Sequence, residues 1–270
     1  NELCDRLGLD TITAGNVLAF AMECFERGLI GPEDTGGLEL RFGHHEAMAE
    51  AIQRIGRREG RLFDLLAEGV ARAAKAIGKG AEEFAIHVKG LEPPGYDPRG
   101  LKGVALAYAV SARGACHLRH VAYRPNLTGQ HPFRPGVEVD RLSYEGQAEM
   151  VVELEDFYAA VDSMVLCRFL CLPTIGPILW PELAAIYSAT TGLEARPENL
   201  RALGARINDL VRAINVREGI TREHDTLPER FFKHPIAGQV VDRAAFERML
   251  DEYYALRGWD EQGRPREVPA

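Results

Sequence analysis

Two short stretches, far apart in the chain, share a frame that could bind a polar ligand. One is Asp5-Arg6-Leu7-Gly8-Leu9-Asp10, and the other is Asp162-Ser163-Met164-Val165-Leu166-Cys167. Each has an aspartate, two variable residues, a small or apolar residue, a leucine and then an acidic or thiol residue. A carboxylate accepts hydrogen bonds from paired N–H donors, such as those of a pterin ring, and neighbouring backbone groups can complete the contact. Two matching loops therefore suit a ligand that has two similar halves.

The same residues also have a purely structural interpretation. Asp10 or Thr11 stands where the N-cap of a following helix is expected, and Gly8 stands where a turn glycine is expected. For the first stretch alone, this structural interpretation is the stronger one. The recurrence of the frame at Asp162 is what favours a ligand.

Cysteines offer a second kind of chemistry. Cys167 and Cys171 stand four residues apart, so they would share a face of a helix. Isolated cysteines usually pack as small hydrophobic residues. A thiolate can instead bind a metal, but one thiolate makes a weak site, so a cluster here needs ligands from elsewhere.

A run of small residues and histidines, Gly114–His120, is the third candidate. Imidazole titrates near neutral pH, so His117 could donate or accept a proton at a pocket wall. The alternative is that it only caps carbonyl groups at a helix end. His117 and His120 are three residues apart, but no third ligand is evident, so a zinc site is not expected.

Helical periodicity must supply the elements that position these residues. Apolar spacing predicts helices over 17–29, 46–58, 63–77, 101–114, 150–161, 179–191, 197–217 and 243–256. A short strand is predicted over 85–89, then a rigid turn rich in proline and glycine through Arg99, and a long loop over 121–143. Because no βαβ rhythm appears, the predicted class is all-α, multihelical, with minor β.

The composition is that of an ordinary globular protein, with 270 residues, 46% hydrophobic and 27% charged. The net charge of −8, without a basic stripe, argues against nucleic-acid binding. No apolar run reaches the roughly 18–20 residues of a membrane helix.

Five cysteines without a CxxC pair favour a reducing, cytoplasmic compartment. Since the chain begins at Asn1 and enters a dense motif at once, we expect a piece of a longer protein.

Several stretches, in order from Asp5 to about Trp259, resemble the aldehyde:ferredoxin oxidoreductase family. Besides the two aspartate-led frames, they are Lys89–Glu92, Asp97–Arg99, Arg113–Arg119, Asn215–Gly219 and Asp225–Pro228. The resemblance implies two helical domains that flank a cofactor junction. Residues 1–12 would end the middle helical domain, with a short return at 84–90, residues 13–260 would form the C-terminal helical domain, and residues 261–270 would be a flexible tail.

The resemblance also implies cofactors and partners. The cofactors are a tungsten ion held by two pterins (tungstopterin), a 4Fe-4S cluster and optionally Mg²⁺. The partners are an aldehyde substrate, ferredoxin and, as in the family, a second copy of the chain. The pterin contacts would carry over to Asp5, Leu9, Asp10, Asp162, Leu166 and Arg119. Cys167 would be the last of four cluster ligands, and His117 would move a proton as the aldehyde becomes a carboxylate.

The chain departs from the family pattern in three respects. Val165 stands where family members often have glycine. The other three cluster cysteines and a β-rich N-terminal domain are expected before Asn1, and the acidic residue expected beside His117 is not found in the chain. Two other functions stay open: a non-catalytic helical fragment or subunit that binds a partner carrying the N-terminal domain, and the same scaffold reducing an aryl thioester.

Overall fold

The chain folds into two compact units, and the computed structural model describes residues 1–171 and 178–266. The first unit consists of Asn1–Gly95, Arg113–Cys116 and Leu227–His234, and the second of Tyr96–Ala112, His117–Thr226 and Pro235–Ala270. In the described ranges, the β-structure consists of isolated bridges such as Val88–Leu91, so the predicted all-α class with minor β is confirmed. The domain boundary predicted between residues 12 and 13 comes from the family resemblance. It differs from the division into compact units and stays a prediction.

The first unit packs around α2, Thr11–Glu26. More than one face of this helix carries buried apolar side chains. Asp10 begins this helix, because its carboxylate accepts a hydrogen bond from the Thr13 N–H at 2.7 Å. The surrounding helices are α1 (Glu2–Leu7), α3 (Pro32–Thr35), α4 (His45–Arg57), α5 (Gly60–Leu66), α6 (Val70–Ile77), the 3₁₀ helix η1 (Ala81–Phe84) and α12 (Glu229–Lys233).

The single helix predicted over 63–77 is wrong, because the structure has two helices there, α5 and α6. Gly69 separates them with a φ of +88°, which favours glycine. The Glu92 carboxylate, far along the chain, accepts a hydrogen bond from the Val70 N–H at 2.7 Å and so caps α6. The strand predicted over 85–89 is also wrong: Val88 makes only an isolated bridge to Leu91.

The second unit is built around α7, Lys102–Val110, in which every residue is buried. Its remaining helices are α8 (Tyr123–Thr128), α9 (Gln147–Ser163), the 3₁₀ helix η2 (Arg168–Cys171), α10 (Trp180–Thr191), α11 (Pro197–Arg217), the 3₁₀ helix η3 (Arg222–His224) and α13 (Arg243–Arg257). The helix predicted over 101–114 therefore ends early, and α8 interrupts the loop predicted over 121–143. None of the helices in the described ranges combines the length and hydropathy that a bilayer crossing requires.

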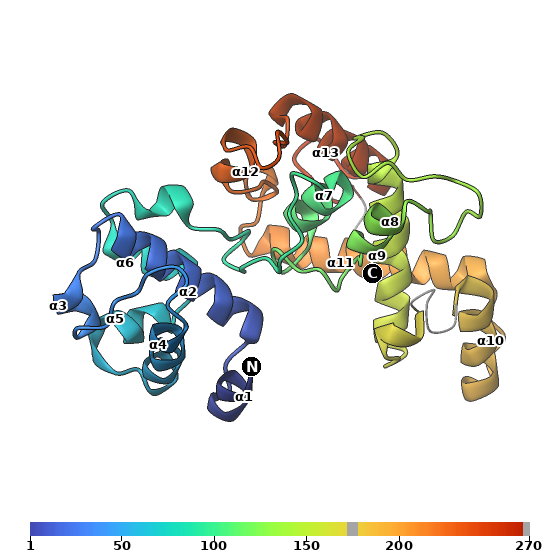
Figure 1. The fold of residues 1–270 in the computed structure, drawn as a ribbon. Coiled ribbons are helices and arrows are strands. Elements are labelled where there is room, and N and C mark those ends of the chain that lie inside the picture. Colours follow the sequence, from blue (N-terminus) through green and yellow to red (C-terminus); the bar gives the residue numbers. More distant parts are fainter. Residues whose placement is uncertain (172–177, 267–270) are drawn as a thin grey trace. The chain divides into compact units, whose positions relative to one another are not determined.

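Helices α9 and α11 share the most extensive helix–helix contact of the second unit (Figure 1). At their contact, Gly204 of α11 lies against the α9 backbone. A Cβ atom at this position would stand 2.1 Å from the Asp156 carbonyl oxygen. The absence of a side chain at Gly204 is therefore a condition for this packing.

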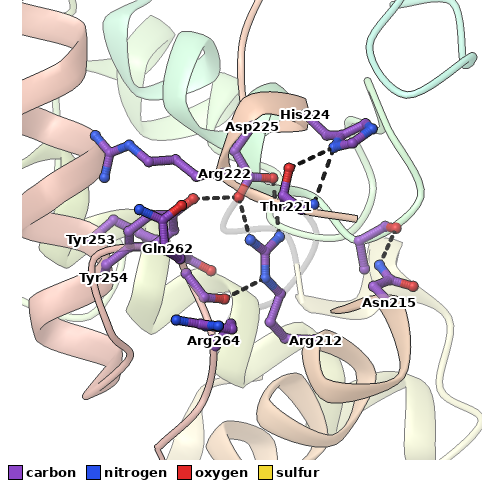
Figure 2. A network of polar contacts seen from close by, with 12 residues as sticks. Arg212, Asn215, Thr221, Arg222, His224, Asp225, Tyr253, Tyr254, Gln262 and Arg264 are labelled. Carbon is purple, nitrogen blue, oxygen red and sulfur yellow. Dashed lines mark hydrogen bonds and ion pairs between the residues drawn. The ribbon is translucent and has the colours of Figure 1, made fainter. Parts of the chain in front are cut away.

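A buried ion pair ties α11 to the segments that follow it (Figure 2). The Arg212 guanidinium lies 2.7 Å from the Asp225 carboxylate, and both side chains are almost fully buried. Arg212 also donates to the Gly263 carbonyl oxygen at 2.7 Å, and the Tyr254 hydroxyl donates to Asp225. Gly263, which lies within the tail predicted over 261–270, is thus buried and hydrogen-bonded, while residues 267–270 lie outside the described ranges.

Replacing Gly204 with alanine should lower the free energy of unfolding by about 3 kcal/mol, because α9 and α11 would have to separate. Gly15→Ala is the matched control, since this glycine lies inside α2 with open space around its Cβ position. There alanine should raise the free energy of unfolding by up to about 1 kcal/mol. Urea unfolding of the purified protein measures both, and equal effects of the two substitutions would contradict the packing argument.

Replacing Asp225 with alanine should cost about 3–5 kcal/mol of unfolding free energy, because the buried Arg212 charge would lose its partner. The control is Asp251→Ala, which breaks a 2.7 Å pair with Arg222 on a side chain that is 63% exposed. That pair should contribute less than about 1 kcal/mol. Thermal unfolding of the two variants tests the difference.

Candidate functional site

The first aspartate-led frame forms the end of α1 and the turn into α2. Gly8 ends α1 in the left-handed region, with φ 69° and ψ 32°. The Leu9 N–H donates to the Cys4 carbonyl oxygen at 2.9 Å, and the Gly8 N–H faces the Asp5 carbonyl oxygen at 3.4 Å. These two bonds define a Schellman motif, in which Asp5 occupies the last turn of the helix.

The second frame has the same backbone arrangement at the end of α9. The Leu166 N–H donates to the Val161 carbonyl oxygen at 3.2 Å, and the Val165 N–H donates to the Asp162 carbonyl oxygen at 3.0 Å. Val165 takes the left-handed position with a φ of +56°, and it is 91% exposed. The frame seen in the sequence is therefore a repeated helix end, in which each aspartate stands three residues before the left-handed residue.

The two copies differ in the residue that follows the leucine. Asp10 is the N-cap of α2 through its Oδ1 atom, as the structural interpretation predicted. Cys167 instead precedes the short helix η2, where its carbonyl oxygen accepts from the Leu170 N–H at 3.0 Å. Its thiol is exposed, whereas the other four cysteines are buried. Burial raises the pKa of the Cys171 thiol, which fits a packing role for that residue.

Asp162 connects the second frame to the histidine run. Its Oδ2 atom accepts a close hydrogen bond from Arg168 and lies 3.7 Å from Nη1 of Arg119. Arg168 also lies over the Tyr158 ring, with 5.2 Å between its Cζ atom and the ring centroid. Its Nη1 atom is buried and has no hydrogen-bond partner in the described part of the chain. This arrangement gathers one carboxylate and two guanidinium groups close to Cys167 in the chain.

His117 lies half-buried in an aromatic cluster. Its ring centroid is 5.9 Å from that of Tyr96 and 6.0 Å from that of Tyr123. The two tyrosine rings are stacked at 4.1 Å, and burial raises the pKa of the Tyr123 hydroxyl, with Tyr96 adding to the effect. His120, by contrast, is fully buried, and its Nδ1 atom accepts from the Ala122 N–H at 3.0 Å.

The structure divides the predicted site residues between the two compact units. Asp5, Leu9 and Asp10 belong to the first unit. The members in the second unit are His117, Arg119, Asp162, Leu166 and Cys167. Among these, the structure brings Arg119 into an ion pair with Asp162.

Sequence reasoning missed both tyrosines beside His117. The sequence predicts a rigid turn at Tyr96 and a loop at Tyr123, and neither prediction gives the tyrosine a role. An aromatic residue in a turn rich in proline and glycine was the available signal at Tyr96. No local signal indicated the stacking, because the two rings are far apart in the chain.

Relatives of known name cover nearly all of the chain. Residues 1–268 match the family model described as aldehyde ferredoxin oxidoreductase, domains 2 and 3. The tungsten-containing aldehyde ferredoxin oxidoreductases of Pyrococcus furiosus and Pyrococcus horikoshii are 36% and 37% identical to the chain, over 99% and 98% of its length. An aliphatic sulfonate oxidoreductase, WOR-like subunit, of Pyrococcus furiosus is 31% identical over 98% of the chain. The chain spans 43%, 43% and 40% of these relatives, respectively.

A solved structure shares the fold. The active-site complex BamBC of benzoyl coenzyme A reductase superposes with a TM-score of 0.76 at 24% identity, over 95% of this chain and 42% of that chain. At this level of identity, the likeness concerns the fold alone. The family model, in contrast, matches the sequence from residue 1 to residue 268, and this match shows that the chain belongs to the aldehyde ferredoxin oxidoreductase family, as its domains 2 and 3.

Proposed function

We propose that this chain is the C-terminal part of a tungsten–pterin oxidoreductase that oxidises aldehydes to carboxylic acids and passes the electrons through a 4Fe-4S cluster to ferredoxin. The repeated helix end carries the proposal. Two loops have the same pair of backbone hydrogen bonds, and in each loop an aspartate and a leucine occupy the same two positions. In the second loop, the next residue is Cys167, whose thiol is exposed. Each loop would hold one pterin, and the thiol would be a ligand of the neighbouring metal cluster.

The aspartates would hold the pterins by accepting their N–H groups, with Leu9 and Leu166 offering backbone groups. A carboxylate has two acceptor oxygens, so Asp10 can cap α2 through Oδ1 and still accept from a ligand through Oδ2. Asp5 is exposed at the end of α1 and would bind the same pterin. Asp162 would bind the other pterin, with Arg119 beside it.

The residues around Asp162 fit an anionic, acceptor-rich group. Arg168 is mostly buried, and its Nη1 atom is a donor without a hydrogen-bond partner in the described ranges. Leaving a buried charged donor unsatisfied is costly, so an acceptor from a bound group would stabilise this side chain. The exposed Cys167 thiol directly before it would be the one cluster ligand that this chain supplies.

When bound, tungsten would supply a Lewis acid and a two-electron acceptor. His117 would give or take the proton of the reaction at an imidazole nitrogen, because imidazole groups are suited to general acid–base chemistry. The stacked Tyr96 and Tyr123 rings restrict the orientation of the imidazole and keep water from part of its surface.

A second candidate function is a helical subunit without catalytic activity of its own, which binds a partner carrying the remaining domain. Its support is an exposed apolar patch beside Cys167. Val165, Phe169 and Leu170 are 91%, 64% and 43% exposed. Exposed apolar clusters of this kind mark interaction surfaces. Metal analysis separates the two functions.

Replacing His117 with alanine in the full-length, tungsten-loaded enzyme should lower kcat for acetaldehyde by roughly 100-fold or more, because the proton carrier is lost. His45→Ala is the control, since that side chain is 83% exposed at the start of α4, and its turnover should match the wild type. Unchanged turnover of the His117 variant would remove this residue from the proposed mechanism.

Metal content tests the cluster ligand. Protein purified without oxygen should contain about one tungsten and about four irons per molecule, measured by mass spectrometry. Cys167→Ser should lower the iron content. Cys116→Ser, at a buried cysteine whose sulfur accepts a hydrogen bond from Arg113, is the control and should keep the wild-type iron content. Wild-type protein without tungsten or iron would favour the helical subunit instead.

A further inference from the structure

Arg168 connects the second helix end to the thiol proposed as a cluster ligand. It directly follows Cys167 in the chain and begins the 3₁₀ helix η2. Its side chain is 18% exposed, so the guanidinium is largely withdrawn from water. Two contacts hold the side chain. It donates a close hydrogen bond to Oδ2 of Asp162, and it lies over the Tyr158 ring with 5.2 Å between its Cζ atom and the ring centroid.

One donor of this guanidinium is left over. The Nη1 atom is buried, and within residues 1–171 and 178–266 it has no hydrogen-bond partner. A buried charged donor without an acceptor is costly, so a bound group that accepts from Nη1 would stabilise the side chain. The sulfur atoms of an iron–sulfur cluster accept hydrogen bonds, and these bonds are among the factors that set the reduction potential of the cluster.

The two helix ends differ in how they hold positive charge. The residue that follows the frame is Thr11 at the first end and Arg168 at the second. Within the first frame, Arg6 pairs with Glu2 at 3.6 Å, and its side chain is 74% exposed. At the second end, Arg168 pairs with Asp162, the aspartate of the frame itself, and is largely buried. The buried charge thus accompanies the copy of the frame that ends in a thiol.

A fixed positive charge has a definite effect on a neighbouring redox group. One-electron reduction adds a negative charge to a cluster, so a nearby cation stabilises the reduced form and raises the reduction potential. The effect is larger for a buried side chain, because water and salt screen it less. The Asp162 carboxylate opposes the effect, since it carries a negative charge beside the same guanidinium.

We propose that Arg168 raises the reduction potential of the cluster that Cys167 would bind, through its charge and by donating from Nη1 to a cluster sulfur, with Asp162 as the opposing charge. This inference rests on the proposed function. Removing the guanidinium should make the cluster harder to reduce, and removing the Asp162 charge should make it easier to reduce. A residue that only supported the fold would not produce shifts of opposite sign.

A redox titration of the full-length enzyme, purified without oxygen and followed by the EPR signal of the reduced cluster, tests this role. In Arg168→Gln, we expect the ratio of reduced to oxidised cluster at a given potential to fall about tenfold, which is a shift of about 59 mV to lower potential for one electron. Arg168→Lys keeps the charge but not the planar group, and its ratio should stay within about threefold of the wild type.

Arg201→Gln is the matched control. Arg201 also lies over an aromatic ring, with 4.9 Å between its Cζ atom and the centroid of Trp180, and its side chain is 44% exposed. It pairs with Glu153, which precedes Asp162 by nine residues on α9 and so lies roughly 14 Å away along the helix axis. At that distance the charge is largely screened, so the same ratio should change by less than about twofold.

An unchanged potential in Arg168→Gln, or a shift in Arg168→Lys as large as that in Arg168→Gln, would overturn the inference and leave the proposed function standing. If Arg168→Gln does not retain iron, Asp162→Asn decides. Its potential should rise above that of the wild type, and a potential that stays or falls rules out the proposed role of Arg168. Wild-type enzyme without iron would overturn the proposed function, and the inference with it.

Discussion

The complete burial of α7 is the constraint on which the second unit depends. A helix buried on all sides must satisfy its polar groups within the protein. The Lys102 ammonium does so by donating to the carbonyl oxygens of Arg99 and Val240 at 2.8 and 2.7 Å.

Gly103 permits close packing of the same helix, since a Cβ atom there would stand 2.4 Å from Oε1 of Gln147. Just after α7 ends, the Asn215 side chain donates a hydrogen bond to the Ala112 carbonyl oxygen at 2.7 Å. This bond fixes the backbone two residues before the run Gly114–His120 begins.

The ion pairs of the second unit differ in how far they are buried. Asp162 is held between Arg168 and Arg119, so its carboxylate stays near the second helix end without being fully buried. The ion pairs deeper in this unit, such as Arg212 with Asp225, are almost fully buried and support the fold instead. Exposure therefore separates the charges that a ligand can reach from those that fix the helices.

Helix bounds could be predicted accurately from the sequence where a single apolar face and a local start signal define the helix. The helix over 197–217 has the predicted bounds, because its apolar period is regular and Pro197 marks its start. Prediction failed where a distant residue intervenes: Glu92 caps α6 across the chain, and the apolar period runs on through Gly69. The same holds at the site, because Asp10 as N-cap follows from local rules, while the stacking of Tyr96 on Tyr123 depends on tertiary structure.

The repeated helix end has a consequence for how such sites are found by sequence. The left-handed residue is Gly8 in one copy and the exposed Val165 in the other, and both complete the same pair of backbone bonds. A search pattern that requires glycine at this position would recover the first copy and discard the second. A pattern that scores the aspartate, the leucine and a helix ending between them recovers both, so repeated helix ends of this kind are better sought by backbone conformation than by residue type.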